Sequence, residues 1–182
     1  MGSLLDDVMP EYDVNEVHSL WVPAEPRAAY DAVLAVTASE VRLFGPLMAL
    51  RTLGRSRRAF DARAPLLDEM TRIGFVELGR RPGEEVALGA IGRFWSPFRN
   101  RPVAVDDFAR FAEPGYAKAA MNFVVTAEDG GSRITTETRI VGTDRDATRQ
   151  FARYWRLIRG GSGAIRRSWL KGIRRRLARI EH

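Results

Sequence analysis

Alternating apolar and polar positions predict antiparallel strands over much of the chain. The segment from Tyr12 to Val22 alternates in this way and is rich in valine, leucine and tryptophan, which indicates a first strand. From Ile73 onward the apolar period is again two, and turns containing glycine or proline interrupt it. We therefore expect a sheet of about six strands. The later strands are expected as two hairpins, Ile73 to Arg80 with Glu84 to Phe94 and Asp107 to Phe111 with Tyr116 to Ala127, and a last strand from Ser132 to Val141.

Helical spacing predicts two short helices after the first strand. Pro26 suits the first turn of a helix, where its missing N–H needs no partner, and apolar residues follow at helical spacing to about Thr37. Farther along, Val41 to Leu53 is apolar but contains Gly45-Pro46, which predicts a broken second helix. An exposed loop over Arg55 to Ala64 and one helical turn over Pro65 to Thr71 complete this region.

One apolar stripe marks the C-terminal part of the chain as a single helix. Asp144 suits the N-cap, where its carboxylate can accept bonds from free backbone N–H groups. The stripe keeps its phase across Gly160 to Gly163, although each glycine costs about 1 kcal/mol relative to alanine. We therefore expect one long helix with an unexplained glycine-rich interruption. Its apolar positions are Phe151, Tyr154, Trp155, Ile158, Ile165, Trp169, Ile173, Leu177 and Ile180.

These elements predict an α+β fold of the helix-grip type. An antiparallel sheet and one long apolar-striped helix bury their apolar faces when the curved sheet wraps around the helix. A length of 182 residues suits one domain. We expect an N-terminal extension over residues 1–11 and a single domain over residues 12–182. Whether residues 39–71 form a lid stays open.

Composition excludes several kinds of chemistry. The chain has no cysteine, which excludes disulfides, thiolate catalysis and cysteine-ligated metals. Its two histidines are His18 and His182, too few for a histidine-rich metal site. We therefore expect no cofactor and no metal. The segment from Met1 to Pro10 does not have the pattern of a secretory signal, and no apolar run approaches 18 residues, so we expect a cytoplasmic protein.

Positive charge is concentrated at the C-terminal end. From Arg149 onward, 11 arginine or lysine side chains face one acid, Glu181, whereas the rest of the chain has 18 basic and 22 acidic residues. This end could contact an anionic membrane surface, or it could be a solvated helix face. Nucleic acid is a less favoured partner because nothing resembles a nucleic-acid-binding module. The candidate anion-binding residues are Arg166, Arg167, Arg174, Arg175 and Arg176.

Element order and two short phrases resemble a known superfamily. Val22-Pro23-Ala24-Glu25-Pro26, followed by Ala29-Tyr30, is similar to the opening of the SRPBCC superfamily, and Gly130 to Thr135 is similar to its penultimate turn, which enters the last strand. This superfamily includes START lipid-transfer domains, birch-pollen-allergen-like proteins and the polyketide cyclase/dehydrase family. The resemblance extends from about Tyr12 to Ile180. It implies a cavity between sheet and helix for a hydrophobic small molecule or lipid, sometimes with chemistry on it.

The residues that would line such a cavity follow from the strand phases. Small residues expected to face inward, Gly89, Ala117 and Ala119, leave room for a ligand, although a filled core is an equally open reading of the residue types. The expected ligand-binding residues are Trp95, Phe98, Phe108, Met121, Phe123, Thr136, Thr138, Tyr154 and Ile158.

Polar residues on inward phases raise the possibility of an enzyme. Arg110, Glu77 and Tyr154 are the candidate catalytic residues of a cyclase- or dehydratase-like reaction on a carbonyl compound. The alternative is a structural ion pair or an outward position. His18 could act as a general base because Glu16 shares its strand phase and could orient it, but a strand histidine is more often a rim residue. The sequence leaves open whether any reaction occurs.

Overall fold

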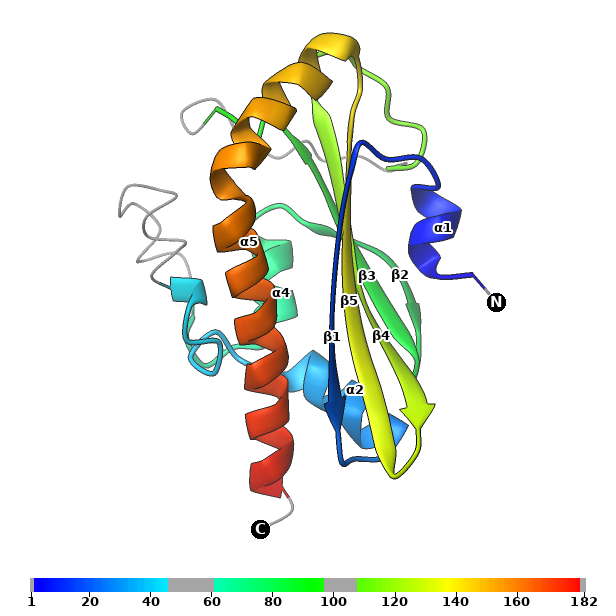
Figure 1. Cartoon of the computed structure of the whole chain (residues 1–182), viewed down its shortest axis with the longest axis vertical. Coiled ribbons are helices and arrows are strands. Elements are labelled where there is room, and N and C mark those ends of the chain that lie inside the picture. The colour runs from blue at the N-terminus through cyan, green and yellow to red at the C-terminus, as the bar shows by residue number, and fades with distance from the viewer. Residues whose placement is uncertain (1, 46–60, 97–107, 181–182) are drawn as a thin grey trace.

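The computed structural model describes residues 2–45, 61–96 and 108–180, and it shows a curved antiparallel sheet with a long helix across one face (Figure 1). Five strands lie in the order β1-β5-β4-β3-β2. The long helix, α5, runs from Arg145 to Ile180 and packs against β1, β4 and β5. This arrangement confirms the expected helix-grip fold. The strands are β1 (Val14–Val22), β2 (Val76–Arg81), β3 (Glu85–Gly92), β4 (Ala117–Glu128) and β5 (Gly131–Gly142).

The described part of the chain has five strands where about six were expected. Phe108, Ala109 and Arg110 form a turn where a strand from Asp107 to Phe111 was expected. Phe108 is buried on the sheet face opposite α5, in an apolar cluster with Leu5 and Ala120. The stretch is held over the sheet by side chains and not by strand pairing, since Phe108 and Phe111 pack on the apolar cluster and Lys118 of β4 donates a hydrogen bond to the Ala109 carbonyl at 2.9 Å.

The two central strands have the faces that their alternation predicts. Met121, Phe123 and Val125 on β4 belong to the core cluster that includes Trp169 of α5. Ala120, one position out of phase, lies in the cluster on the opposite face. The register pairs Phe123 with Thr136 on β5, so the inner face continues from strand to strand.

Two short helices contribute apolar side chains to the core shared by the sheet and α5. Helix α2 (Pro26–Ala35) begins at the expected proline and contributes Tyr30 and Val33 to the core. Helix α4 (Leu66–Arg72) forms where one helical turn was expected and buries Leu66 and Leu67. Residues 46–60 contain most of the expected broken helix and exposed loop, which therefore lie outside the described residues, as does much of the possible lid.

Helix α5 is continuous, as the stripe predicts. The Asp144 carboxylate accepts hydrogen bonds from the backbone N–H groups of Asp146 at 2.7 Å and Ala147 at 2.8 Å, which confirms Asp144 as the N-cap. Within the described chain, no helix combines the length and the apolar composition needed to cross a membrane.

The N-terminal residues pack on the opposite face of the sheet. Helix α1 (Leu4–Val8) contacts β2, β3 and β4, and Leu5 is fully buried there. Arg139 of β5 donates hydrogen bonds to the Asp6 carboxylate at 2.6 Å and to the Met9 carbonyl at 3.1 Å. A segment expected as an extension is thus held by burial and by an ion pair.

Candidate functional site

Polar side chains gather on the inner face of the sheet beneath the middle of α5. Strand β1 turns Glu16 and His18 toward α5, on the same face as its core residue Leu20. Antiparallel pairing sets His18 opposite Thr136 and Glu16 opposite Thr138. The paired strands β1 and β5 therefore bring a carboxylate, an imidazole and two hydroxyls to one patch of the sheet.

Glu16 and His18 form the pair that their shared strand phase suggests. The His18 Nε2 atom lies 3.0 Å from Glu16 Oε1, and the side chains are only 16% and 18% exposed. Gly163 of α5 packs directly over this pair. A Cβ atom at Gly163 would lie 2.5 Å from Glu16 Oε1 and 3.4 Å from His18 Nε2. The glycine thus allows the helix to approach the pair, which gives part of the interruption a structural reason.

Arg166 points from α5 toward the sheet. Its Nη2 atom donates to the Met121 sulfur at 2.9 Å, and its guanidinium lies 5.7 Å from the centre of the Trp169 ring. Burial lowers the pKa of Arg166 to about 10, opposed by the attraction of the Glu16 carboxylate. Arg166 was expected on an anion-binding surface, and the structure instead turns it, half-buried, toward the sheet.

Several polar atoms of this cluster are buried without a hydrogen-bond partner among the described residues. They are Glu16 Oε2, Thr136 Oγ1, Arg166 Nη1 and Trp169 Nε1. Buried polar atoms are almost always paired, because an unpaired one costs about 1–3 kcal/mol. The Arg166 and Trp169 atoms can only donate and the carboxylate can accept, so the cluster offers complementary bonds to a further molecule. We call these four residues with His18 the inner polar cluster.

Apolar side chains lie next to the inner polar cluster. Met121 contacts Arg166, and the Phe123 ring packs against Trp169 with their centres 5.0 Å apart. Met121, Phe123, Thr136 and Thr138 therefore lie on the inner face, where the sequence placed the expected ligand-binding residues.

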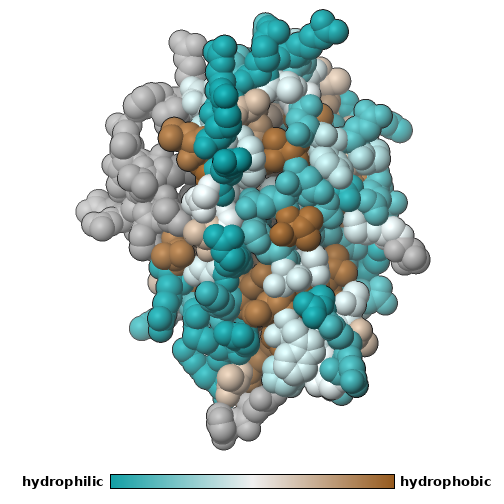
Figure 2. Space-filling view, viewed as in Figure 1, coloured by the Kyte–Doolittle hydropathy of each residue, from teal (hydrophilic) through white to brown (hydrophobic). Residues whose placement is uncertain are grey.

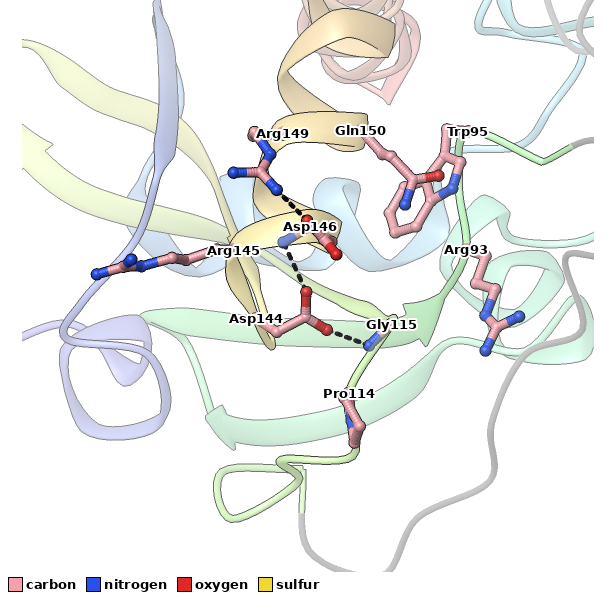
Figure 3. A pocket seen from close by; sticks show the side chains of 9 residues that line it. All are labelled: Arg93, Trp95, Pro114, Gly115, Asp144, Arg145, Asp146, Arg149 and Gln150. Atoms are coloured by element: carbon pink, nitrogen blue, oxygen red, sulfur yellow. Dashed lines mark hydrogen bonds and ion pairs between the residues drawn. The ribbon is translucent and has the colours of Figure 1, made fainter.

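A hollow lies away from this cluster, at the N-terminal end of α5, and Figure 3 shows it from close by. It is a surface groove of about 800 Å³, and its lining contains both acids and bases. Trp95 lines it, and near Trp95 the ring of Tyr154 packs edge-on against Phe151 at 6.0 Å. Ile158 is half-buried farther along α5. The lining residues are Arg93, Trp95, Pro114, Gly115, Asp144, Arg145, Asp146, Arg149 and Gln150.

Other expected site residues lie away from the inner polar cluster and from the groove at the N-terminal end of α5. Glu77 is at the surface, where its carboxylate pairs with Arg80 at 2.7 Å, and Arg110 is in an exposed turn. Both residues therefore have the outward position that the sequence left open as an alternative, and Glu77 forms a structural ion pair. Phe108 and Gly89 face the side opposite α5, where a Cβ at Gly89 would lie 2.8 Å from the Phe108 ring. Phe98 lies outside the described residues.

The remaining basic candidates divide into two groups. Arg175 donates to the Glu40 carbonyl, and Arg176 pairs with the Glu40 carboxylate at 3.0 Å, so both have structural partners. Arg167 and Arg174 are exposed. Within the described ranges, no group of three or more histidine, cysteine or acidic residues could hold a metal.

Sequence reasoning assigned Arg166 to an anion-binding surface and Trp169 to the apolar stripe, and it missed both as members of the inner polar cluster, although a signal was present. Arg166 precedes Trp169 by three positions and Ile173 by seven, so it shares the phase of the apolar stripe. A lone arginine on the apolar phase of a helix indicates a guanidinium that points inward. The signal was overlooked because many other arginines surround Arg166 in the sequence.

Comparisons with known proteins give no family assignment. No family model matches the chain, and no curated protein is significantly similar to it. Solved structures resemble it loosely. Protein CV1439 from Chromobacterium violaceum is 12% identical with a TM-score of 0.39, covering 90% of this chain and 96% of its own. Protein MLL2253 from Mesorhizobium loti is 12% identical with a TM-score of 0.41, covering 89% and 98%. Ara h 8.0201 is 11% identical with a TM-score of 0.37, covering 91% and 97%. Similarity at this level carries no argument about ligand or activity.

Proposed function

We propose that the protein binds an amphipathic small molecule between the sheet and α5, with the polar group of that molecule at Arg166. The observation that supports this function is the inner polar cluster, in which four buried polar atoms from β1, β5 and α5 have no partner among the described residues. A bound molecule would supply the missing partners and offset their desolvation. Membership of the SRPBCC superfamily is part of the same proposal.

The cluster favours a ligand that carries a carboxylate or a carbonyl. Arg166 Nη1 and Trp169 Nε1 both donate, and a charge-assisted bond to a guanidinium is stronger than a neutral one. Glu16 Oε2 accepts, so a hydroxyl on the same molecule would also be bound. Met121 and Phe123 give the apolar remainder a surface.

The test compares two neighbouring arginines. Native mass spectrometry of freshly purified protein should show an adduct that is absent from the denatured mass, and calorimetric titration should detect binding of dodecanoate, a carboxylate with an apolar chain. Arg166→Met should weaken dodecanoate binding about 10- to 100-fold, because it removes a buried charge-assisted bond. Arg167→Met changes the same residue type at an exposed position and should bind like the wild type.

Two results would overturn the proposal. If neither an adduct nor dodecanoate binding is found, the unpaired atoms are hydrated by buried water and define no ligand site. If Arg166→Met and Arg167→Met bind dodecanoate equally well, any site lies elsewhere in the molecule.

Proton transfer on a carbonyl compound, as in a cyclase or dehydratase, is a second candidate. The Glu16–His18 contact of 3.0 Å favours it, because a carboxylate that orients an imidazole is the usual arrangement for a general base. Arg166 would polarise the carbonyl. If the molecule identified by mass spectrometry loses water or isomerises with the wild type, His18→Gln should keep binding and abolish the conversion. Equal conversion by His18→Gln would exclude this role.

A further inference from the structure

The solvent-facing side of α5 carries a row of positive charges. Arg153, Arg156, Arg167, Lys171 and Arg174 are all exposed. Their spacings of three, four and eleven residues are those of one helix face, and at 1.5 Å per residue the row extends over about 30 Å of helix. Figure 2 shows hydrophilic side chains along the course of α5. We call these five residues the outer basic row.

The outer basic row is not used to hold the fold together. No ion pair or hydrogen bond is found for these five side chains within the described residues, whereas Arg176 and Arg179, on a different side of α5, pair with Glu40. From Arg149 to Ile180 the helix has no acidic residue at all. The row is therefore a surface of uncompensated charge on a rigid element.

Exposed leucines accompany these charges. Leu157 is 84% exposed and lies four residues after Arg153, so the two side chains are neighbours on the helix. Leu43 is 42% exposed and lies beside α5, where its backbone N–H donates to Ser168 Oγ at 3.3 Å. A surface that combines cations with protruding apolar side chains is complementary to a lipid bilayer with anionic headgroups.

We propose that the outer basic row docks the protein on an anionic membrane surface, with α5 parallel to the membrane plane and Leu157 entering the headgroup region. Phosphates of a nucleic acid would match the charges but offer no partner for the leucines. The row also has no aromatic side chain on which bases could stack. This docking is independent of the small-molecule site, because the row points away from the sheet and the inner polar cluster points toward it.

The test is co-sedimentation of the full chain with vesicles. Wild-type protein should bind vesicles of phosphatidylcholine with one-third phosphatidylglycerol at low salt, bind pure phosphatidylcholine vesicles weakly, and dissociate as salt is raised. Each cation near an anionic surface contributes about fivefold to partitioning. Replacing Arg153, Arg156, Lys171 and Arg174 by glutamine should therefore lower the partition coefficient by about two to three orders of magnitude.

A matched control separates the row from net charge. Replacing the exposed Arg27, Arg63 and Arg80 and the half-buried Arg133 by glutamine removes the same charge at positions off α5 and should leave most of the binding. Equal losses in the two quadruple variants would overturn the proposal, as would absence of binding to the anionic vesicles.

A single apolar substitution separates a membrane from a nucleic acid. Leu157→Gln should weaken vesicle binding several-fold without changing the charge. If Leu157→Gln binds vesicles like the wild type, or if the wild type binds a mixed-sequence DNA duplex and not the vesicles, the row does not dock on a membrane. Dodecanoate binding should be the same in all these variants, so failure here is distinguishable from failure of the proposed ligand site.

Discussion

Replacing Gly163 by alanine should destabilise the protein, whereas the same replacement at Gly160 should stabilise it. Both glycines lie within α5, where alanine gains about 1 kcal/mol of helix propensity over glycine. A Cβ at Gly160 meets nothing within 4 Å, so this gain is kept. A Cβ at Gly163 would lie 2.5 Å from Glu16 Oε1, so the carboxylate must move.

Gly163→Ala should be destabilising because moving the Glu16 carboxylate breaks an existing contact. Displacing Glu16 Oε1 from its position breaks its 3.0 Å contact with His18 Nε2, and a hydrogen bond to a charged group contributes about 2 kcal/mol. The net effect is a loss of about 1 kcal/mol at Gly163 against a gain of about 1 kcal/mol at Gly160. For a protein of this length each corresponds to about 2–4 °C in melting temperature, in opposite directions.

Urea and thermal denaturation of the two variants measure this difference, and a double mutant isolates its cause. In a Glu16→Ala background no carboxylate remains to clash, so Gly163→Ala should become stabilising. If Gly163→Ala raises the melting temperature as much as Gly160→Ala in the wild-type background, α5 does not approach β1 as closely as described. If the Glu16→Ala background leaves the effect of Gly163→Ala unchanged, the clash involves another group.

Three further perturbations test the packing around the sheet. Leu5→Ala should lower the free energy of unfolding by about 3 kcal/mol, because Leu5 is fully buried under α1, and a urea titration showing less than about 1 kcal/mol would mean that α1 is not docked. Glu85→Ala should lower the free energy of unfolding by about 3 kcal/mol, because the buried Glu85 carboxylate accepts a hydrogen bond from Asn122 Nδ2 at 2.7 Å. In the same urea titration, Glu85→Gln should lower it by less than Glu85→Ala does. For Glu40, burial raises the pKa, but hydrogen bonds from the Thr37 backbone and from Arg176 outweigh it, and the pKa is lowered in the folded state. The ionised Glu40 carboxylate therefore stabilises the folded state above about pH 4.5, and this stabilisation is lost as the pH falls through the folded pKa. The difference in unfolding free energy between wild type and Glu40→Gln should shrink on acidification, and a constant difference would contradict this.

The fold follows from the sequence where periodicity extends over many residues. The two faces of β4, the span of α5 across its glycines and the Asp144 cap each rest on local spacing, which the backbone geometry of strands and helices dictates. The short apolar stretch around Phe108 gave no such constraint, because a few residues fit a strand or a turn equally well. Which face of the sheet Phe108 covers is decided by its tertiary packing against Leu5 and Ala120.

The site follows from the sequence only in part. Glu16 and His18 share a strand phase, so their pairing could be predicted. The arrival of Arg166 beside them could not, because it depends on how α5 crosses the sheet and on Gly163 allowing a close approach. The same holds for the division of the C-terminal arginines into inner partners of Glu40 and an outer basic row. Local spacing determines which side chains share a face, but only the packing of one element on another determines what that face meets.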